Sequence, residues 1–88
     1  MKKKGEEKRE PSISTYHELT VHMIGSHVTL LFDNQDSMDE FFWKAEKNIG
    51  FDRPIFYEGK VKTLSCEIKE GTMYFNPRNI QAIEMRKE

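Results

Sequence analysis

Three histidines, His17, His22 and His27, are the residues whose type first suggests chemistry, because imidazole nitrogens bind transition metals. A structural zinc site needs four converging ligands, usually as two close pairs along the chain. In the hairpin described below, His22 and His27 share one face as diagonal neighbours, while His17 points to the other face. This arrangement favours histidines on a half-exposed strand, and we therefore predict no metal site.

Cys66 is the one cysteine of the sequence. A cysteine nucleophile needs an exposed, electropositive setting and a nearby base. The position of Cys66 between Leu64 and Ile68 predicts a small buried hydrophobic residue instead. No glycine-rich phosphate loop, G-x-S-x-G or H-E-x-x-H motif is present. We therefore expect no catalytic residue and no cofactor, and we predict that the protein is not an enzyme.

Four carboxylates, Asp33, Asp36, Asp39 and Glu40, follow one another with no basic residue between them. Helix capping and solubility are one explanation for this acidic cluster. The other is a patch complementary to a basic partner surface, where charge steers the encounter. Four carboxylates beside an aromatic side chain could also imitate the phosphates of a nucleic acid.

Trp43 lies about 140° from Met38 on a helical wheel drawn at roughly 100° per residue, so it falls outside the apolar stripe of the predicted helix. Its neighbours on the wheel are Asp39, Glu46 and Lys47. Two interpretations stay open: packing beneath the N-terminal arm or a loop, and an exposed anchor of the kind enriched at interface hot spots. The residues that we predict to bind a partner are Asp33, Asp36, Asp39, Glu40, Trp43 and Glu46.

The elements that position these residues begin with a hairpin over residues 16–32. Gly25-Ser26 predicts a two-residue loop of type II′, since glycine is the first residue. This loop places six apolar residues on one face, and a slip of one residue would expose them all. The predicted facing pairs are Met23–Val28, Val21–Leu30 and Leu19–Phe32.

A helix over about residues 38–48 follows. Ser37 and Glu40 form a capping box, and Gly50 supplies the left-handed residue that ends helices. Apolar residues at helical spacing form one stripe. The members of this stripe are Met38, Phe41, Phe42, Ala45 and Ile49.

Two further hairpins are predicted, with turns at Glu58-Gly59 and Glu70-Gly71. The first has a mixed pattern, which leaves a bulge or a separately packed segment over residues 55–57 as alternatives. Pro77 predicts a type I turn before a last strand over residues 80–85. The fold class is α+β, an antiparallel hairpin-built sheet in the order β-β-α-β-β-β-β with one amphipathic helix packed on one face. The first and last strands are candidate open edges through which a weak homodimer could form.

The chain has 88 residues, 36% of them hydrophobic, which indicates a single small domain. We expect a flexible charged arm over residues 1–15 and one domain over residues 16–88. Residues 1–10 carry five basic and three acidic side chains, so their net charge is +2. The remainder carries −3, which gives the net charge of −1 for the chain. A single cysteine and the lack of a long apolar stretch predict a cytoplasmic protein that does not enter a membrane.

The competing function is direct nucleic-acid binding. The arm is basic, and Tyr57, Tyr74, His22 and His27 could offer stacking surfaces on the outer face of the sheet. The net negative charge of the predicted domain and the lack of a known nucleic-acid-binding motif argue against it.

In its short length, diluted charge, single cysteine and lack of catalytic motifs, the chain resembles the small host-takeover proteins of bacteriophages. The strand–turn–strand segment of residues 74–84, YFNPRNIQAIE, is also similar to sequence segments in small phage and bacterial regulatory proteins. The resemblance implies a protein that binds and inhibits a host factor, often through an acidic surface that mimics nucleic acid. We therefore predict a non-catalytic protein-binding module, an inhibitor or regulator whose partner is a basic nucleic-acid-binding protein.

Overall fold

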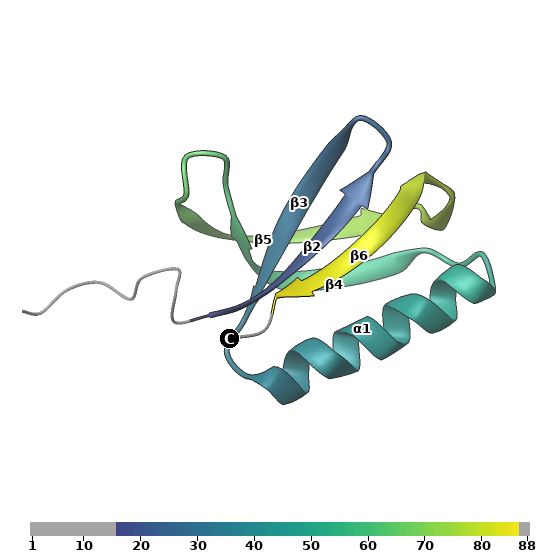
Figure 1. Cartoon of the computed structure of the whole chain (residues 1–88), viewed down its shortest axis with the longest axis horizontal. Coiled ribbons are helices and arrows are strands. Elements are labelled where there is room, and N and C mark those ends of the chain that lie inside the picture. Colours follow the sequence, from purple (N-terminus) through teal and green to yellow (C-terminus); the bar gives the residue numbers. More distant parts are fainter. Residues whose placement is uncertain (1–15, 87–88) are drawn as a thin grey trace, which may run out of the picture.

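The computed structural model describes residues 16–86, and the arm predicted over residues 1–15 lies outside the described residues. Figure 1 shows one helix lying along one face of a twisted sheet, which confirms the predicted α+β class. In chain order the elements are β2 (His17–Met23), β3 (Ser26–Phe32), α1 (Gln35–Gly50), β4 (Ile55–Lys62), β5 (Ile68–Phe75), the short 3-10 helix η2 (Pro77–Asn79) and β6 (Ile80–Arg86).

The described strands form a sheet in the order β5-β4-β3-β2-β6, and every neighbouring pair is antiparallel. The last strand, β6, returns across the molecule to pair with β2. As a result β2 is an inner strand, and the expectation that the first strand is an open edge is wrong. Of the described strands, β5 and β6 lie at the two edges of the sheet.

The first hairpin has its predicted face but a different register. Leu19 lies opposite Leu30, Val21 opposite Val28, and Met23 opposite Ser26, so the loop is Ile24-Gly25 rather than Gly25-Ser26. Gly25 has φ +83 at the second loop position, a conformation that favours glycine. Because the register moves by two residues, each side chain keeps its face of the sheet.

The predicted turns at Glu58-Gly59 and Glu70-Gly71 are wrong, and the described residues contain one strand fewer than expected. Strands β4 and β5 run straight through these positions, and Gly59 lies opposite Gly71 in their ladder. The chain turns instead at residues 63–67, where the Thr63 hydroxyl accepts a hydrogen bond from the Glu67 amide at 3.0 Å. The mixed pattern of this region therefore reflects a loop that begins after residue 62, and not a bulge.

Helix α1 begins earlier than predicted. Asn34 is the N-cap, and its side-chain oxygen accepts a hydrogen bond from the Ser37 amide at 2.8 Å, so the capping box at Ser37 is wrong. The helix continues two residues beyond its predicted end, to Gly50, and the left-handed residue that follows it is Asp52, with φ +58, so the left-handed role predicted for Gly50 is wrong. Asn and Asp tolerate this conformation better than most residues because their short polar side chains bond locally.

The core lies between α1 and the face of β2, β3 and β4 that the helix covers. The predicted helical stripe is confirmed: Met38 and Ala45 are fully buried, and the other members pack partly buried against the core. Three rings, those of Phe32, Phe41 and Tyr57, contact one another with centroids 5.5–5.7 Å apart. The turn at Pro77 and the last strand are also as predicted, with the Asn79 amide donating to the Asn76 carbonyl at 2.9 Å.

Candidate functional site

The outward face of α1 carries a tryptophan that nothing in the described chain covers. Trp43 is 71% exposed, although it lies only two residues from the fully buried Ala45. Two residues correspond to roughly 200° around a helix, so the indole points away from the sheet. Packing beneath a loop of residues 16–86 is therefore wrong, while packing beneath the arm lies outside the described residues.

Carboxylates surround the indole on the same side of the helix. At about 100° per residue, Asp36, Glu40 and Trp43 fall within an arc of about 60°, and all three are exposed. Asp39 flanks this arc half-buried, and its carboxylate accepts a hydrogen bond from the Gln35 side chain at 3.2 Å. Glu46 flanks it one turn further on and is exposed. We call the six predicted binding residues, from Asp33 to Glu46, the acidic helix face.

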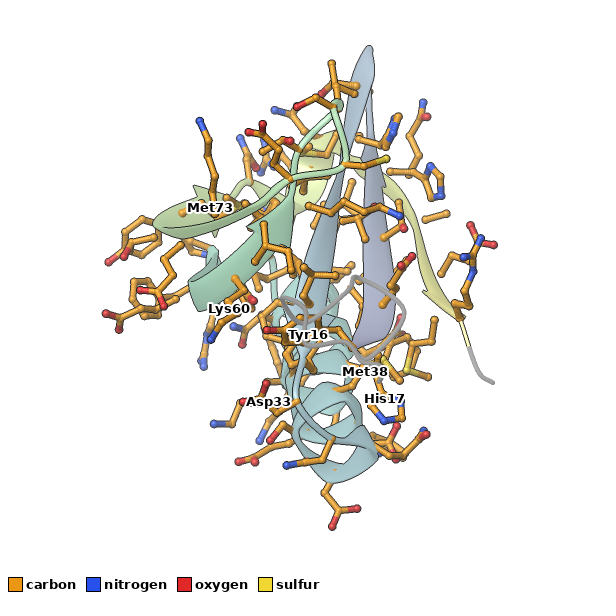
Figure 2. The ribbon with its side chains drawn as sticks, turned by 90° about the vertical axis from the view of Figure 1, so that its left-hand side faces the viewer. Tyr16, His17, Asp33, Met38, Lys60 and Met73 are labelled. Carbon is orange, nitrogen blue, oxygen red and sulfur yellow. The ribbon has the colours of Figure 1, made fainter. Side chains whose placement is uncertain are left out.

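Asp33 joins this face from the segment between β3 and α1. Figure 2 shows Asp33 at the end of α1 where the chain enters the helix, below Lys60, and both residues line one hollow together with Tyr57. The structure therefore gathers all six predicted residues at one helix, five on the helix itself and Asp33 just before it. Their spacing along the sequence was enough to predict this, because a single continuous helix carries them.

The charge of the acidic helix face is little compensated by neighbouring side chains. Lys44 approaches Glu40 at 3.5 Å, with both side chains exposed. Within residues 16–86, no ion pair involves Asp33, Asp36 or Asp39. Lys44 and Lys47 lie toward the C-terminal half of the helix, so negative charge is concentrated in the N-terminal half. A shallow hollow of about 470 Å³ is lined by Trp43, Lys44, Glu46 and Lys47.

A second exposed aromatic group lies on the opposite, outer face of the sheet, and the sequence did not predict it. Phe56 is 47% exposed and Tyr74 is 71% exposed. Their ring centroids are 5.0 Å apart, because the two residues are opposite each other in the β4–β5 ladder. The two glycines are a signal for this pair. In an antiparallel ladder in which Gly59 lies opposite Gly71, Phe56, three residues before Gly59, lies opposite Tyr74, three residues after Gly71.

Next to this aromatic pair, the Arg78 guanidinium forms an ion pair with the Asp52 carboxylate. One guanidinium nitrogen lies 2.8 Å from the carboxylate, and Nε lies within 3.3 Å of both its oxygens. These hydrogen bonds lower the pKa of Asp52 and raise the pKa of Arg78. The ion pair joins the end of α1 to η2, and both residues line a hollow of about 520 Å³ together with Pro54 and Tyr74.

The histidines are arranged differently from the prediction. His22 and His27 are directly opposite in the ladder, not diagonal, since the register of the hairpin moved by two residues. Their ring centroids are 6.0 Å apart, and His22 Nε2 lies 3.1 Å from a carboxylate oxygen of Glu84. In the part of the chain that the structure describes, no group of three or more His, Cys, Asp or Glu side chains is placed to hold a metal ion.

Cys66 is exposed, so the prediction of a buried cysteine is wrong. The strand that was expected to bury it ends at Lys62, and Cys66 lies in the following loop with φ +66. Its amide donates a hydrogen bond to the Thr63 carbonyl at 2.9 Å, which closes this loop. An alternating pattern through residues 64–68 therefore did not correspond to a strand.

Of the four rings that the nucleic-acid hypothesis assigns to the outer face of the sheet, the structure removes Tyr57, while Tyr74 is 71% exposed there. Tyr57 is 4% exposed and belongs to the core. Lys62 lies 3.3 Å from both carboxylate oxygens of the nearly buried Glu18, and Lys60 lies 3.8 Å from Glu70. The lysines of this face are therefore already neutralised by carboxylates.

Comparisons of the chain with models of protein families, with curated proteins and with solved structures gave no match. Among residues 16–86, no helix has the length and apolar character needed to cross a membrane.

Proposed function

We propose that the protein is a non-catalytic binding module that docks the acidic helix face on a basic surface of another protein and occludes it. The observation that carries the proposal is the 71% exposure of Trp43 in the middle of that face. An inhibitor or regulator of this kind needs no cofactor and acts where its partner acts, which we take to be the cytoplasm.

The indole supplies the anchor of the interface. Large aromatic side chains bury much apolar area, and tryptophan is enriched among the few residues that dominate binding energy. The aliphatic stems of Lys44 and Lys47 flank the indole in the hollow described above and extend its apolar surface. Truncating such an anchor costs about 2 kcal/mol or more, which is a loss of affinity of about thirtyfold or more.

The carboxylates determine what kind of partner fits. Within residues 16–86 Asp33, Asp36 and Asp39 form no ion pair, so a basic surface can bind them without displacing a basic side chain of this part of the chain. Complementary charge speeds the encounter and selects against acidic partners. The partner class that we propose is a basic nucleic-acid-binding protein, whose groove these carboxylates occupy in place of phosphates. A bacteriophage host-takeover protein would act in this way.

Affinity capture from a cell lysate with matched variants tests the proposal. Trp43→Ala should lose the captured protein, while Tyr74→Ala should keep it, although the two side chains are equally exposed. Asp36→Asn with Asp39→Asn should weaken capture, while Glu67→Gln with Glu70→Gln, two exposed acids outside the proposed surface, should not. The captured protein should then release bound DNA or RNA when the wild-type chain is added.

Direct nucleic-acid binding is the outcome that would overturn the proposal. If the purified chain itself retards DNA or RNA in a gel, with an affinity that falls steeply with salt, its own basic groups contact phosphates. Capture that survives Trp43→Ala would equally remove the acidic helix face as the docking surface.

A further inference from the structure

The two edges of the sheet differ in how they are protected. An edge strand presents unpaired backbone groups to other strands, and natural edges often carry an inward-pointing charge that prevents pairing. On β5 this charge is Lys69, which lies opposite Val61 on the helix-side face. The corresponding residues of β6 are Ile83 and Met85, opposite Val21 and Leu19. The helix-side face of β6 therefore carries no such charge, and its one irregularity is a bulge at Gln81, between the residues opposite His22 and Met23, which leaves residues 82–86 as a regular edge.

The flank beside β6 is also incompletely covered. Helix α1 packs mainly on β2, β3 and β4, and Ile83 and Met85 stay half-buried. On the helix, Phe41 faces the β4 side, because its ring contacts that of Tyr57. Phe42 is about 100° further round and so faces the other flank. An apolar strip that is only half covered thus runs along the open edge.

We propose that β6 pairs antiparallel with the β6 of a second copy of this chain, about a two-fold axis that passes between the two copies of Ile83. Closed dimers bring the same patch of both subunits together, so the edge must be complementary to itself. About this axis no like charges face each other, and the centre of the pairing lies in the regular part of β6 that follows the bulge at Gln81, which gives a continuous ten-stranded sheet. The facing pairs at the centre are Ile83–Ile83 and Glu84–Ala82, and Met85 and Arg86 of each copy continue toward the bulged start of β6 in the other copy.

The pairing has a consequence for the acidic helix face. A two-fold axis perpendicular to the sheet keeps both copies of α1 on the same side of the joined sheet. Trp43 faces away from the sheet and so stays uncovered in each copy. The dimer would therefore present two identical docking surfaces, although the dimer itself does not depend on the proposed function.

The molar mass in solution tests this pairing, measured by light scattering from micromolar to near-millimolar concentration. A Cys66→Ser background removes disulfide-linked dimers, because Cys66 is exposed. The mass should rise to twice the 10.4 kDa of the chain. Ile83→Lys should hold it at one chain, while Thr72→Lys on the other edge should leave the dimer intact, with circular dichroism confirming that each variant folds. A monomer at every concentration, or a dimer lost only with Thr72→Lys, would overturn the proposal.

Cross-linking tests the register of the pairing directly. In the Cys66→Ser background, the two thiols of Ile83→Cys should face each other and oxidise to a covalent dimer. The thiols of Gln81→Cys should stay about 13 Å apart along the strands, at about 3.3 Å per residue, beyond disulfide reach. Cross-linking of Gln81→Cys in preference to Ile83→Cys would contradict the proposed axis.

Discussion

The hydroxyl of Tyr57 occupies the space that a side chain on Gly59 would need. A Cβ atom at Gly59 would lie 2.7 Å from this hydroxyl oxygen. The hydroxyl donates toward the Lys60 carbonyl at 2.6 Å and the Leu31 carbonyl at 3.2 Å. It thereby ties β4 to β3 in the interior, under the ring cluster against which α1 packs.

Gly59→Ala should therefore destabilise the protein by about 1–3 kcal/mol, since the added methyl group displaces a buried hydrogen-bonded hydroxyl. The matched control is Gly71→Ala, at the position directly opposite, where no atom lies within 4 Å of the added Cβ. Urea unfolding of the two variants measures the difference. Equal losses would mean that the close approach to Tyr57 is not what requires glycine.

The same tyrosine predicts a loss of stability in alkali. Burial raises the pKa of the Tyr57 hydroxyl above its ordinary value. As the pH rises, the unfolded chain therefore releases this proton before the folded chain does. The stability that the raised pKa contributes is complete below about pH 10 and is lost as the pH rises through the folded pKa. Tyr57→Phe should cost about 1 kcal/mol at neutral pH. Its stability should also fall less between neutral and strongly alkaline pH than that of the wild type, and parallel curves would contradict this.

The N-terminal cap of α1 offers a second matched pair. Asn34→Ala should cost about 1 kcal/mol, because the side chain that accepts from the Ser37 amide is removed. Ser37→Ala should change stability by less than about 0.5 kcal/mol, as expected for an exposed helical site. Thermal or urea unfolding measures the two stability losses. A larger loss in Ser37→Ala than in Asn34→Ala would identify Ser37 as the cap.

The Asp52–Arg78 pair predicts a shifted titration. Hydrogen bonds from Arg78 hold the pKa of Asp52 below 3.8, so this carboxyl contributes stability above its unfolded pKa and loses it as pH falls through the folded value. Carbon-detected NMR should show the depressed midpoint in the wild type. In Arg78→Ala it should return to about 3.8, and an unchanged midpoint would contradict the ion pair.

The sequence predicted the faces of the first hairpin and the apolar stripe of α1 because both depend only on periodicity. The register could be wrong by two residues without moving Leu19 or Val21 to the other face. Glu-Gly dipeptides in mid-strand were misread, since a glycine required by a neighbouring hydroxyl has the same local sequence signal as a turn. Asn34 and Ser37 are both capping residues, and only the observed backbone distinguishes them.

For the acidic helix face, the wheel placed Trp43 off the core stripe, but tertiary structure was needed to show that no loop of the described chain covers it. The Phe56–Tyr74 pair was missed because it depends on the pairing of β4 with β5. That pairing joins residues 18 positions apart, and the misplaced turns had assigned them to different hairpins.

The most direct test of the central claim follows Trp43 itself when the captured partner is added. Trp43 is the one tryptophan of the chain, so fluorotryptophan labelling gives a single ¹⁹F resonance. Without the partner, this resonance should show the solvent isotope shift of an exposed indole. At saturating partner it should move and lose that shift, because the indole is buried in the interface. An indole that stays exposed in the saturated complex would contradict docking through the acidic helix face.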